Sequence, residues 1–385
     1  MGLLKRPLVI IGFLVVSLAG CGGLRTNRAL HERSGDWPTF ARSVTRKAVG
    51  EQSLSPPLVV AWEYDVTAGV GNGSPVIVDS IVFVTTLRGD LYAIALGTGK
   101  LIGWVGFGES IQGSPVIDGN MAFVAMSNSK ESLAAFDLFE GKPRWKKRFG
   151  DVEVSPLLYD QKLYIGNTSG AFYCVDRGNG EQKWKFELPS NTRLKGIRSS
   201  PAADSATVIF GADDGWVYAL NTDSGALRWK FETGSPVTAS PLIAEGTVYV
   251  GNRAGMIHAI DRSTGVLRWR SDAGAPVTAN AVPTGNMIVL GTTAGTAMGL
   301  RMEDGKRTWV ADLGGPVIAG GALAGDAMYI GTLKKQIFAL RPADGFVLWK
   351  GDVEGRIRTS PAAATGRLFI ATDERTVIAY KEARP

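Results

Sequence analysis

Short stretches of alternating apolar and polar residues recur along most of the chain, at intervals of about 40 residues. In one such unit the stretches are 246–251, 255–261 and 263–269. Alternation with a period of two is typical of a half-buried strand. A dipeptide that ends in glycine, such as Thr264-Gly265, between two stretches is typical of a hairpin turn. Each unit therefore predicts four short antiparallel strands.

Two sequence features recur with the same spacing as these units. Tryptophan recurs once per unit, at Trp62, Trp104, Trp145, Trp184, Trp229, Trp269, Trp309 and Trp349. Ser-Pro recurs at the start of most units, at Ser74, Ser114, Ser155, Ser200, Ser240 and Ser360, and the two missing positions read Asn280-Ala281 and Gly320-Gly321. Because self-similarity at a fixed period indicates a repeat architecture, the chain from about residue 58 onward predicts eight copies of one unit.

A 40-residue sheet cannot cover both of its own faces, so its faces pack on neighbouring units, and closing the ring removes the exposed ends. After Ser360 the chain supplies only three strands, whereas 58–66 around Trp62 has the pattern of a fourth strand. We therefore expect an all-β, eight-bladed β-propeller of four-stranded blades over 58–385, with the last blade closed by the N-terminal strand. The tryptophans then pack between blades.

The N-terminus has the pattern of an export signal. Lys5 and Arg6 precede an apolar run, 8–18, which spans only about 16 Å as a helix and is too short for a bilayer core of about 30 Å. Residues 18–21, Leu-Ala-Gly-Cys, resemble the lipobox of bacterial lipoproteins. We expect a signal peptide over 1–20 and lipidation of Cys21; an ordinary signal peptide with an incidental cysteine is the alternative.

In lipoproteins, an aspartate after the acylated cysteine favours retention at the inner membrane. Gly22 stands there in this chain, so the resemblance implies an outer-membrane protein anchored on the periplasmic face. Residues 21–57 are polar and arginine-rich without sustained periodicity, which predicts a lipidated flexible tether.

Composition and charge narrow the possible chemistry. The net charge is +6, but the basic residues are spread along the chain, so a nucleic-acid footprint is not supported. With two histidines and two cysteines, a zinc site is close to excluded. Cys174 occupies the position at which other units carry Ala93, Ala219 and Ala259, so we interpret it as a small buried packing residue.

The unit Gly-x-Leu/Val-Tyr-Ala-Leu, followed by Gly-x-x-x-Trp, resembles the quinoprotein repeat. Eight such repeats behind a lipobox resemble the BamB-type lipoproteins of the outer-membrane β-barrel assembly machinery. That resemblance implies no enzymatic activity, docking on the periplasmic POTRA domains of the barrel subunit, and assistance to nascent outer-membrane proteins.

The docking segment of that family carries a Leu-x-Leu-Arg-Gly pattern before the fourth blade. Here the segment reads Thr192-Arg193-Leu194-Lys195-Gly196, so Leu194, Lys195 and Gly196 match in type and Thr192 does not. A paired aspartate motif expected before the next blade is replaced by Pro236-Val237-Thr238. The candidate partner-binding residues are Leu194, Lys195, Gly196, Arg198, Arg356, Arg358 and Glu153.

Two alternative functions stay open. One is a generic scaffold of this repeat type in another envelope complex. The other is a quinone-dependent dehydrogenase. Residues 36–40 (Asp-Trp-Pro-Thr-Phe) are similar to the entry of quinoprotein dehydrogenases and also to that of generic propellers with these repeats. Such an enzyme holds its quinone and a calcium ion at the propeller axis, and calcium requires six to eight oxygen ligands.

The residues two positions before each Ser-Pro position test that alternative, because they lead into the innermost strands. They are Asn72, Gln112, Glu153, Arg198, Thr238, Thr278, Ile318 and Arg358. Only one is acidic, and the two arginines are four blades apart, with Arg356 and Lys195 expected close by. Such a rim repels a divalent cation and favours an anion or peptide carbonyls, so we expect no metal, no cofactor and no catalysis. Glu153 and Arg198 form either a structural bridge between blades or part of a binding site.

Overall fold

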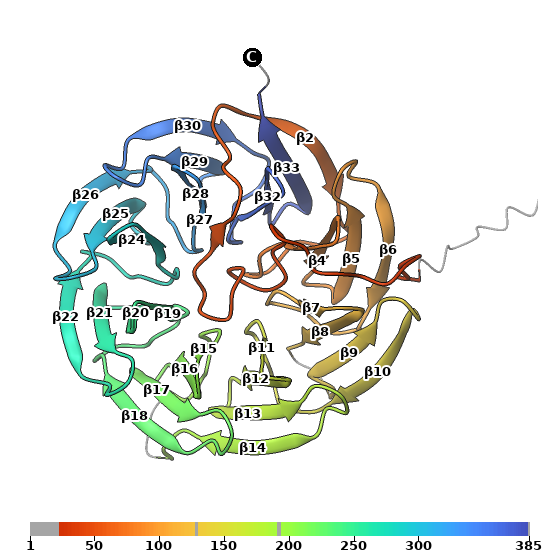
Figure 1. The fold of residues 1–385 in the computed structure, drawn as a ribbon, viewed down its shortest axis with the longest axis horizontal. Coiled ribbons are helices and arrows are strands. Elements are labelled where there is room, and N and C mark those ends of the chain that lie inside the picture. Colours follow the sequence, from red (N-terminus) through yellow and green to blue (C-terminus); the bar gives the residue numbers. More distant parts are fainter. Residues whose placement is uncertain (1–22, 128–129, 191–193, 384–385) are drawn as a thin grey trace, which may run out of the picture.

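The computed structural model describes residues 23–127, 130–190 and 194–383. Eight sheets are arranged in a ring around a central axis (Figure 1). The four strands of each blade are antiparallel to their neighbours, and the innermost strand comes first in the blade. The short strand β1 (Val49–Gly50) adds to the sheet of blade 7 by pairing parallel with its innermost strand. The predicted all-β, eight-bladed propeller is confirmed. No helix in this part of the chain is long and apolar enough to cross a membrane.

The strands have the following bounds. Blade 1 holds β3 (Val76–Val78), β4 (Ile81–Thr85), β5 (Asp90–Ala95) and β6 (Leu101–Gly106). Blade 2 holds β7 (Val116–Asp118), β8 (Met121–Ala125), β9 (Leu133–Asp137) and β10 (Lys142–Lys147). Blade 3 holds β11 (Leu157–Tyr159), β12 (Lys162–Gly166), β13 (Ala171–Asp176) and β14 (Gln182–Glu187). Blade 4 holds β15 (Ala202–Asp204), β16 (Thr207–Gly211), β17 (Trp216–Asn221) and β18 (Leu227–Glu232).

The second half repeats the pattern. Blade 5 holds β19 (Leu242–Ala244), β20 (Thr247–Gly251), β21 (Met256–Asp261) and β22 (Leu267–Asp272). Blade 6 holds β23 (Val282–Thr284), β24 (Met287–Gly291), β25 (Thr296–Arg301) and β26 (Arg307–Asp312). Blade 7 holds β27 (Ala322–Ala324), β28 (Ala327–Thr332), β29 (Gln336–Leu340) and β30 (Val347–Asp352), with β1 (Val49–Gly50) beside β27. Blade 8 holds β31 (Ala362–Ala364), β32 (Arg367–Ala371), β33 (Thr376–Glu382) and β2 (Leu58–Asp65).

The ring is closed by the N-terminal strand, as predicted. β2 pairs antiparallel with β33 from Leu58 opposite Glu382 to Asp65 opposite Thr376. Blade 8 therefore takes its outermost strand from the N-terminal part of the chain and its other three strands from the C-terminal part. This pairing leaves no exposed ring ends.

Most of the repeated tryptophans pack between blades. The indole Nε1 of Trp229, for example, donates a hydrogen bond of 2.8 Å to the carbonyl of Arg262 on blade 5. The hairpin glycine of that blade, Gly265, has a φ of +74°, and a Cβ there would lie 2.8 Å from the Trp229 ring. The same indole-to-carbonyl bond is formed by Trp62, Trp145, Trp184, Trp269 and Trp309. Glycine at the turn thus provides both the backbone conformation and the space for the ring.

Trp104 departs from this pattern. In β6 the residue paired with Ala93 is Gly103, so Trp104 pairs with Tyr92 and stacks on it, with the ring centroids 6.2 Å apart. The space left by the missing indole is filled by Leu24, which is fully buried. A Cβ on Gly103 would lie 3.1 Å from the Leu24 Cα.

The expectation of a flexible tether over 21–57 is wrong for residues 23–57, which pack on the propeller. Trp37 and Arg46 are fully buried. The segment crosses the centre of the ring, seen in red and orange in Figure 1, and its carbonyl groups accept hydrogen bonds from innermost strands of several blades. These innermost strands have a free edge at the axis, and a polar chain with no periodicity satisfies their N–H groups as well as a regular strand would.

Candidate binding site at the propeller axis

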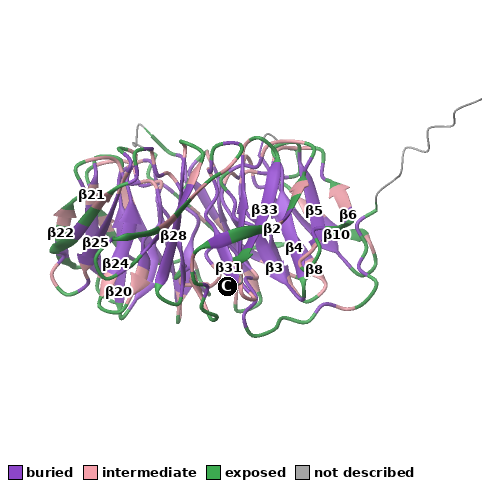
Figure 2. Cartoon of the chain, turned by 90° about the horizontal axis from the view of Figure 1, so that it is seen from above, coloured by how far each residue is buried: buried purple, intermediate pink, exposed green. Residues whose placement is uncertain are grey.

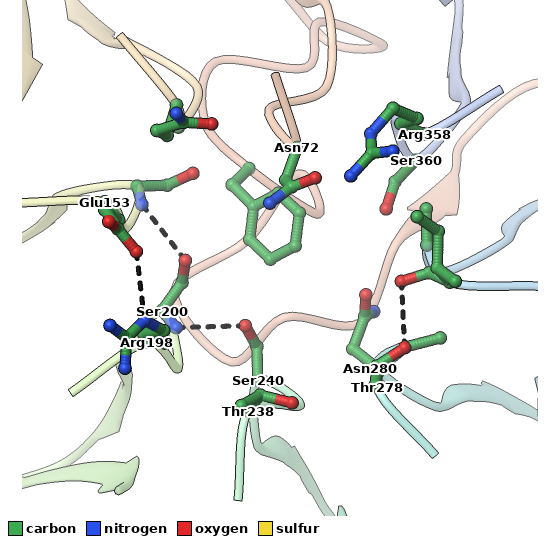
Figure 3. Close-up of a pocket in the computed structure, with 18 of the residues that line it drawn as sticks. Asn72, Glu153, Arg198, Ser200, Thr238, Ser240, Thr278, Asn280, Arg358 and Ser360 are labelled. Atoms are coloured by element: carbon green, nitrogen blue, oxygen red, sulfur yellow. Dashed lines mark hydrogen bonds and ion pairs between the residues drawn. The ribbon is translucent and has the colours of Figure 1, made fainter. Parts of the chain in front are cut away.

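A cavity of about 320 Å³ lies on the axis, and all eight residues predicted to surround the axis line it. They come from the eight loops that connect the outermost strand of one blade to the innermost strand of the next. Figure 3 shows Arg198 and Arg358 on opposite sides of this cavity. The other lining residues include Ser155, Ser200, Ser240, Arg253, Asn280, Ser360 and Phe40.

The serines of the Ser-Pro pairs fix these loops to one another. The Ser114 amide donates to Ser155 Oγ at 2.9 Å, and the Ser155 amide donates to Ser200 Oγ at 3.0 Å. Ser74 and Ser200 donate in the same way to the next blade, at 2.7 and 3.1 Å. The hydroxyl therefore forms an interblade bond close to the axis.

The two units that lack Ser-Pro have a steric explanation. Asn280 is buried beside the cavity, and a Cβ at Gly320 on the next blade would lie 2.1 Å from the Asn280 Oδ1 atom. Glycine at 320 thus makes room for the larger amide side chain at 280. The larger side chain in one unit is therefore accommodated by the missing side chain in the next.

The bridge between Glu153 and Arg198 is present. Arg198 Nε donates to Glu153 Oε2 at 3.0 Å, and the same guanidinium pairs with Asp213. Burial raises the pKa of Asp213, and Arg198 opposes that shift. The Arg198 side chain is still 43% exposed, so the ion pairs orient this guanidinium at the cavity without covering it.

Arg358 and Arg253 also line the cavity, and neither has an ion-pair partner among the described residues. Glu153 is the only carboxylate among the lining residues in that part of the chain. The cavity wall is therefore net positive. This donor set does not fit calcium, which needs several charged oxygen ligands, and no group of three metal-binding side chains occurs within the described ranges.

The cavity wall includes Phe40, which the sequence did not indicate, and the buried Arg46 packs against the Phe40 ring. Phe40 lines the cavity, and the Arg46 guanidinium lies 5.3 Å from the centre of its ring. Arg46 Nε donates to the carbonyl of Pro201 at 2.8 Å and Nη1 to that of Phe40 at 2.7 Å. Burial lowers the pKa of Arg46 to about 9. The N-terminal segment, which the sequence predicts to be solvated, therefore contributes to the wall of the axial cavity.

The residues of the predicted docking segment have different environments. Leu194 is 52% exposed and Lys195 is exposed, whereas Gly196 is buried. A Cβ at Gly196 would lie 2.3 Å from atoms of both Arg198 and Asp213. Gly196 is thus required for the ion pair and presents no side chain to a partner. Thr192 and Arg193 lie outside the described residues.

Arg356 does not line the cavity. Its Nε donates to Asp373 at 2.6 Å, and its amide donates to the same carboxylate at 2.7 Å. Arg356 and Lys195, expected close to the two arginines of the rim, do not line the cavity, and of the seven candidates Glu153, Arg198 and Arg358 do. Cys21 lies outside the described residues.

The repeated blades and the axial cavity define a β-propeller of the quinoprotein-repeat class. A family model described as outer membrane protein assembly factor BamB matches residues 59–212, 174–316 and 303–384. These overlapping matches cover most of the ring, and the chain belongs to this family.

Known proteins similar to this chain include members of two functional groups. It is 30% identical over 126 residues to outer membrane protein assembly factor BamB of Legionella pneumophila (strain Paris), covering 30% of this chain and 32% of the relative. It is 26% identical over 177 residues to the dehydrogenase subunit of alcohol dehydrogenase (quinone) of Gluconobacter oxydans (strain 621H), covering 43% and 19%. Each match spans a third or less of the relative's length.

The solved structure of BamB from Moraxella catarrhalis has a TM-score of 0.72 with this chain. The sequences are 18% identical, and the match covers 84% of this chain and 99% of the other. At this identity the likeness shows a common fold.

Proposed function

We propose that this protein is a non-enzymatic scaffold of the outer-membrane β-barrel assembly machinery. In this proposal it is anchored through lipid on Cys21 to the periplasmic face of the outer membrane. It docks on the POTRA domains of the barrel subunit and assists nascent outer-membrane proteins. Family membership supports the assignment, and the exposed Leu194 beside Lys195 is the observation that carries the docking site.

The loop before blade 4 is suited to contact a partner. An exposed leucine is a hydrophobic anchor, and the neighbouring cations of Lys195 and Arg198 provide charge complementarity for an acidic partner surface. Arg198 is held by two carboxylates, so little side-chain entropy is lost when a partner contacts it.

Recovery of the barrel subunit with the acylated full-length protein tests this docking. Leu194→Asp combined with Lys195→Glu introduces two carboxylates on the loop, and we expect recovery to fall at least about tenfold, since hot-spot losses exceed about 1.4 kcal/mol. The matched control is Leu348→Asp with Lys350→Glu on β30, where both residues are also exposed. Equal recovery of the two double variants would show that the loop is not the docking site.

The quinone-dependent dehydrogenase is the second candidate, because one curated relative is such an enzyme. The positive lining of the axial cavity argues against a calcium-dependent quinone site. Addition of quinone and calcium, followed by a spectral scan and a dye-coupled alcohol assay, separates the two candidates. We expect neither a bound quinone spectrum nor turnover; alcohol-dependent dye reduction would establish an enzyme.

A further inference from the structure

The described chain starts at the outer edge of the ring, between β6 and β10 (Figure 1). Gly23 forms a parallel bridge with Trp104 on β6. The Thr26 amide donates to the Leu138 carbonyl at 2.7 Å, and Arg25 Nε donates to the Phe139 carbonyl at 3.0 Å, both on the turn before β10. Together with the buried Leu24, these contacts fix the start of the chain at the junction of blades 1 and 2.

This attachment restricts where lipid on Cys21 can lie. Cys21 is two residues before Gly23, so their Cα atoms are at most about 7 Å apart. An acyl chain on Cys21 would therefore enter the membrane next to the outer strands of blades 1 and 2.

These two outer strands differ from the other six in charge. Three residues after the interblade tryptophan, six blades carry an exposed carboxylate: Asp65, Glu187, Glu232, Asp272, Asp312 and Asp352. At the same position blade 2 carries Arg148, which is exposed and has no ion-pair partner among the described residues. In blade 1 the corresponding residue is Gly106.

The composition of the two strands extends this difference. β6 (LIGWVG) is the only outer strand without a charged residue, and Leu101 and Ile102 on it are 42% and 38% exposed. β10 (KPRWKK) has only basic charges. Each of them pairs with a carboxylate of a neighbouring segment, namely Glu140, Asp137, Glu131 and Glu181, so the unpaired charge at this edge is that of Arg148. Phe139, on the turn that holds Arg25, is 37% exposed. Apolar and basic side chains thus surround the start of the chain.

We propose that this edge, formed by β6, β10 and the 138–141 turn, lies on the surface of an anionic lipid bilayer, with the propeller standing edge-on to the membrane. Exposed apolar residues insert at the headgroup boundary, and basic residues contact anionic headgroups. A carboxylate at this position would be repelled, which accounts for its absence from these two blades alone. Figure 2 shows β6 and β10 together at one side of the ring. The proposal rests on the lipid anchor of the proposed function.

Quenching by spin-labelled lipids tests the orientation. Leu101 and Leu267 occupy the same register position on blades 1 and 5, opposite Ile94 and Ile260, and are exposed to 42% and 37%. Each is replaced by cysteine in the acylated full-length protein carrying Cys174→Ala, labelled with a fluorophore and placed in phosphatidylethanolamine–phosphatidylglycerol vesicles. We expect quenching at position 101 and none at position 267. Equal quenching at both positions would overturn the proposal.

A charge variant tests the role of the basic strand. Arg148→Asp gives blade 2 the carboxylate of the other six blades, and one basic contact at an anionic surface is worth about fivefold in population. We expect quenching at position 101 to fall by up to about that factor in the anionic vesicles, and Arg270→Asp on blade 5 to leave it unchanged. Equal effects of the two variants would contradict the assigned edge.

The mass of the N-terminal peptide from the same preparation separates the possible failures. An unmodified Cys21 overturns both the lipid anchor and the edge-on orientation. An acylated protein with equal quenching at the two positions overturns the orientation alone. Failure of the unsubstituted protein to recover the barrel subunit, with normal quenching, contradicts the proposed docking and leaves the orientation standing.

Discussion

His258 provides a test of how burial in a blade controls protonation. It lies on β21 opposite Val250 and Arg270, at a position where other blades carry Tyr92, Tyr173, Tyr218, Met298 and Phe338. The side chain is 4% exposed, its ring meets the Phe231 ring edge-on at 5.5 Å, and its Nδ1 has no hydrogen-bond partner among the described residues. No carboxylate is among the groups of the described residues that shift the pKa of this imidazole.

Burial, assisted by the positive charge of Arg270, lowers the pKa of His258 from 6.5 to about 4. As the pH falls below 6.5, the unfolded chain binds a proton at this position and the folded chain does not. Stability contributed by the neutral histidine is therefore complete above pH 6.5 and is lost as the pH falls towards 4. The full difference is worth about 3 kcal/mol of unfolding free energy.

The measurement is urea unfolding at pH 7.0 and pH 4.5 for the original protein and for His258→Phe, which introduces the residue found on blade 7. Other groups titrate in both proteins and cancel in the comparison. We expect the original protein to lose about 2 kcal/mol more than the variant between the two pH values. Parallel pH dependence of the two proteins would refute the argument that His258 is buried in its neutral form.

Two further predictions concern the ring itself. Gly265→Ala places a methyl group 2.8 Å from Trp229. The control, Gly274→Ala, is at a position with nearly the same φ, +75°, where the methyl group meets open space. We expect the Gly265→Ala variant to be less stable than the control by about 1–3 kcal/mol in thermal unfolding. Similar melting of the two variants would mean that the tryptophan is not tightly packed on the turn. Deleting 58–65 removes the strand that completes blade 8, so calorimetry should show a large fall in melting temperature; unchanged melting would argue against closure by β2.

The ring could be predicted from the sequence because each blade leaves a signal in its side chains. Strand alternation, the turn glycine and the tryptophan recur with every blade, and counting them gave both the number of blades and the closure. The residues around the axis were found in the same way, since Ser-Pro marks the start of each innermost strand. Glu153, Arg198 and Arg358 line the cavity as expected.

The N-terminal segment could not be predicted, because it is held mainly by its backbone. The carbonyls of Val44 and Thr45 accept hydrogen bonds from Ala203 and Ile243, and such contacts require no particular side chains. Arg46 had the appearance of a solvated charge, although carbonyl groups and an aromatic ring enclose it. A signal for Leu24 was present: glycine replaces tryptophan at the third position of β6, which marks a gap for another side chain.

Edge-on attachment and docking through the loop before blade 4 are compatible in one molecule. The edge that we propose to lie on the membrane is at the junction of blades 1 and 2. Leu194 lies at the junction of blades 3 and 4, which is two of eight blades, or a quarter of a turn, further round the ring. In the proposed orientation the propeller axis runs along the membrane, and the docking loop lies a quarter of a turn from the membrane-facing edge. Under these two proposals the buried Leu24 has a consequence beyond stability, because it fixes the start of the chain and with it the blades that a bound partner would reach.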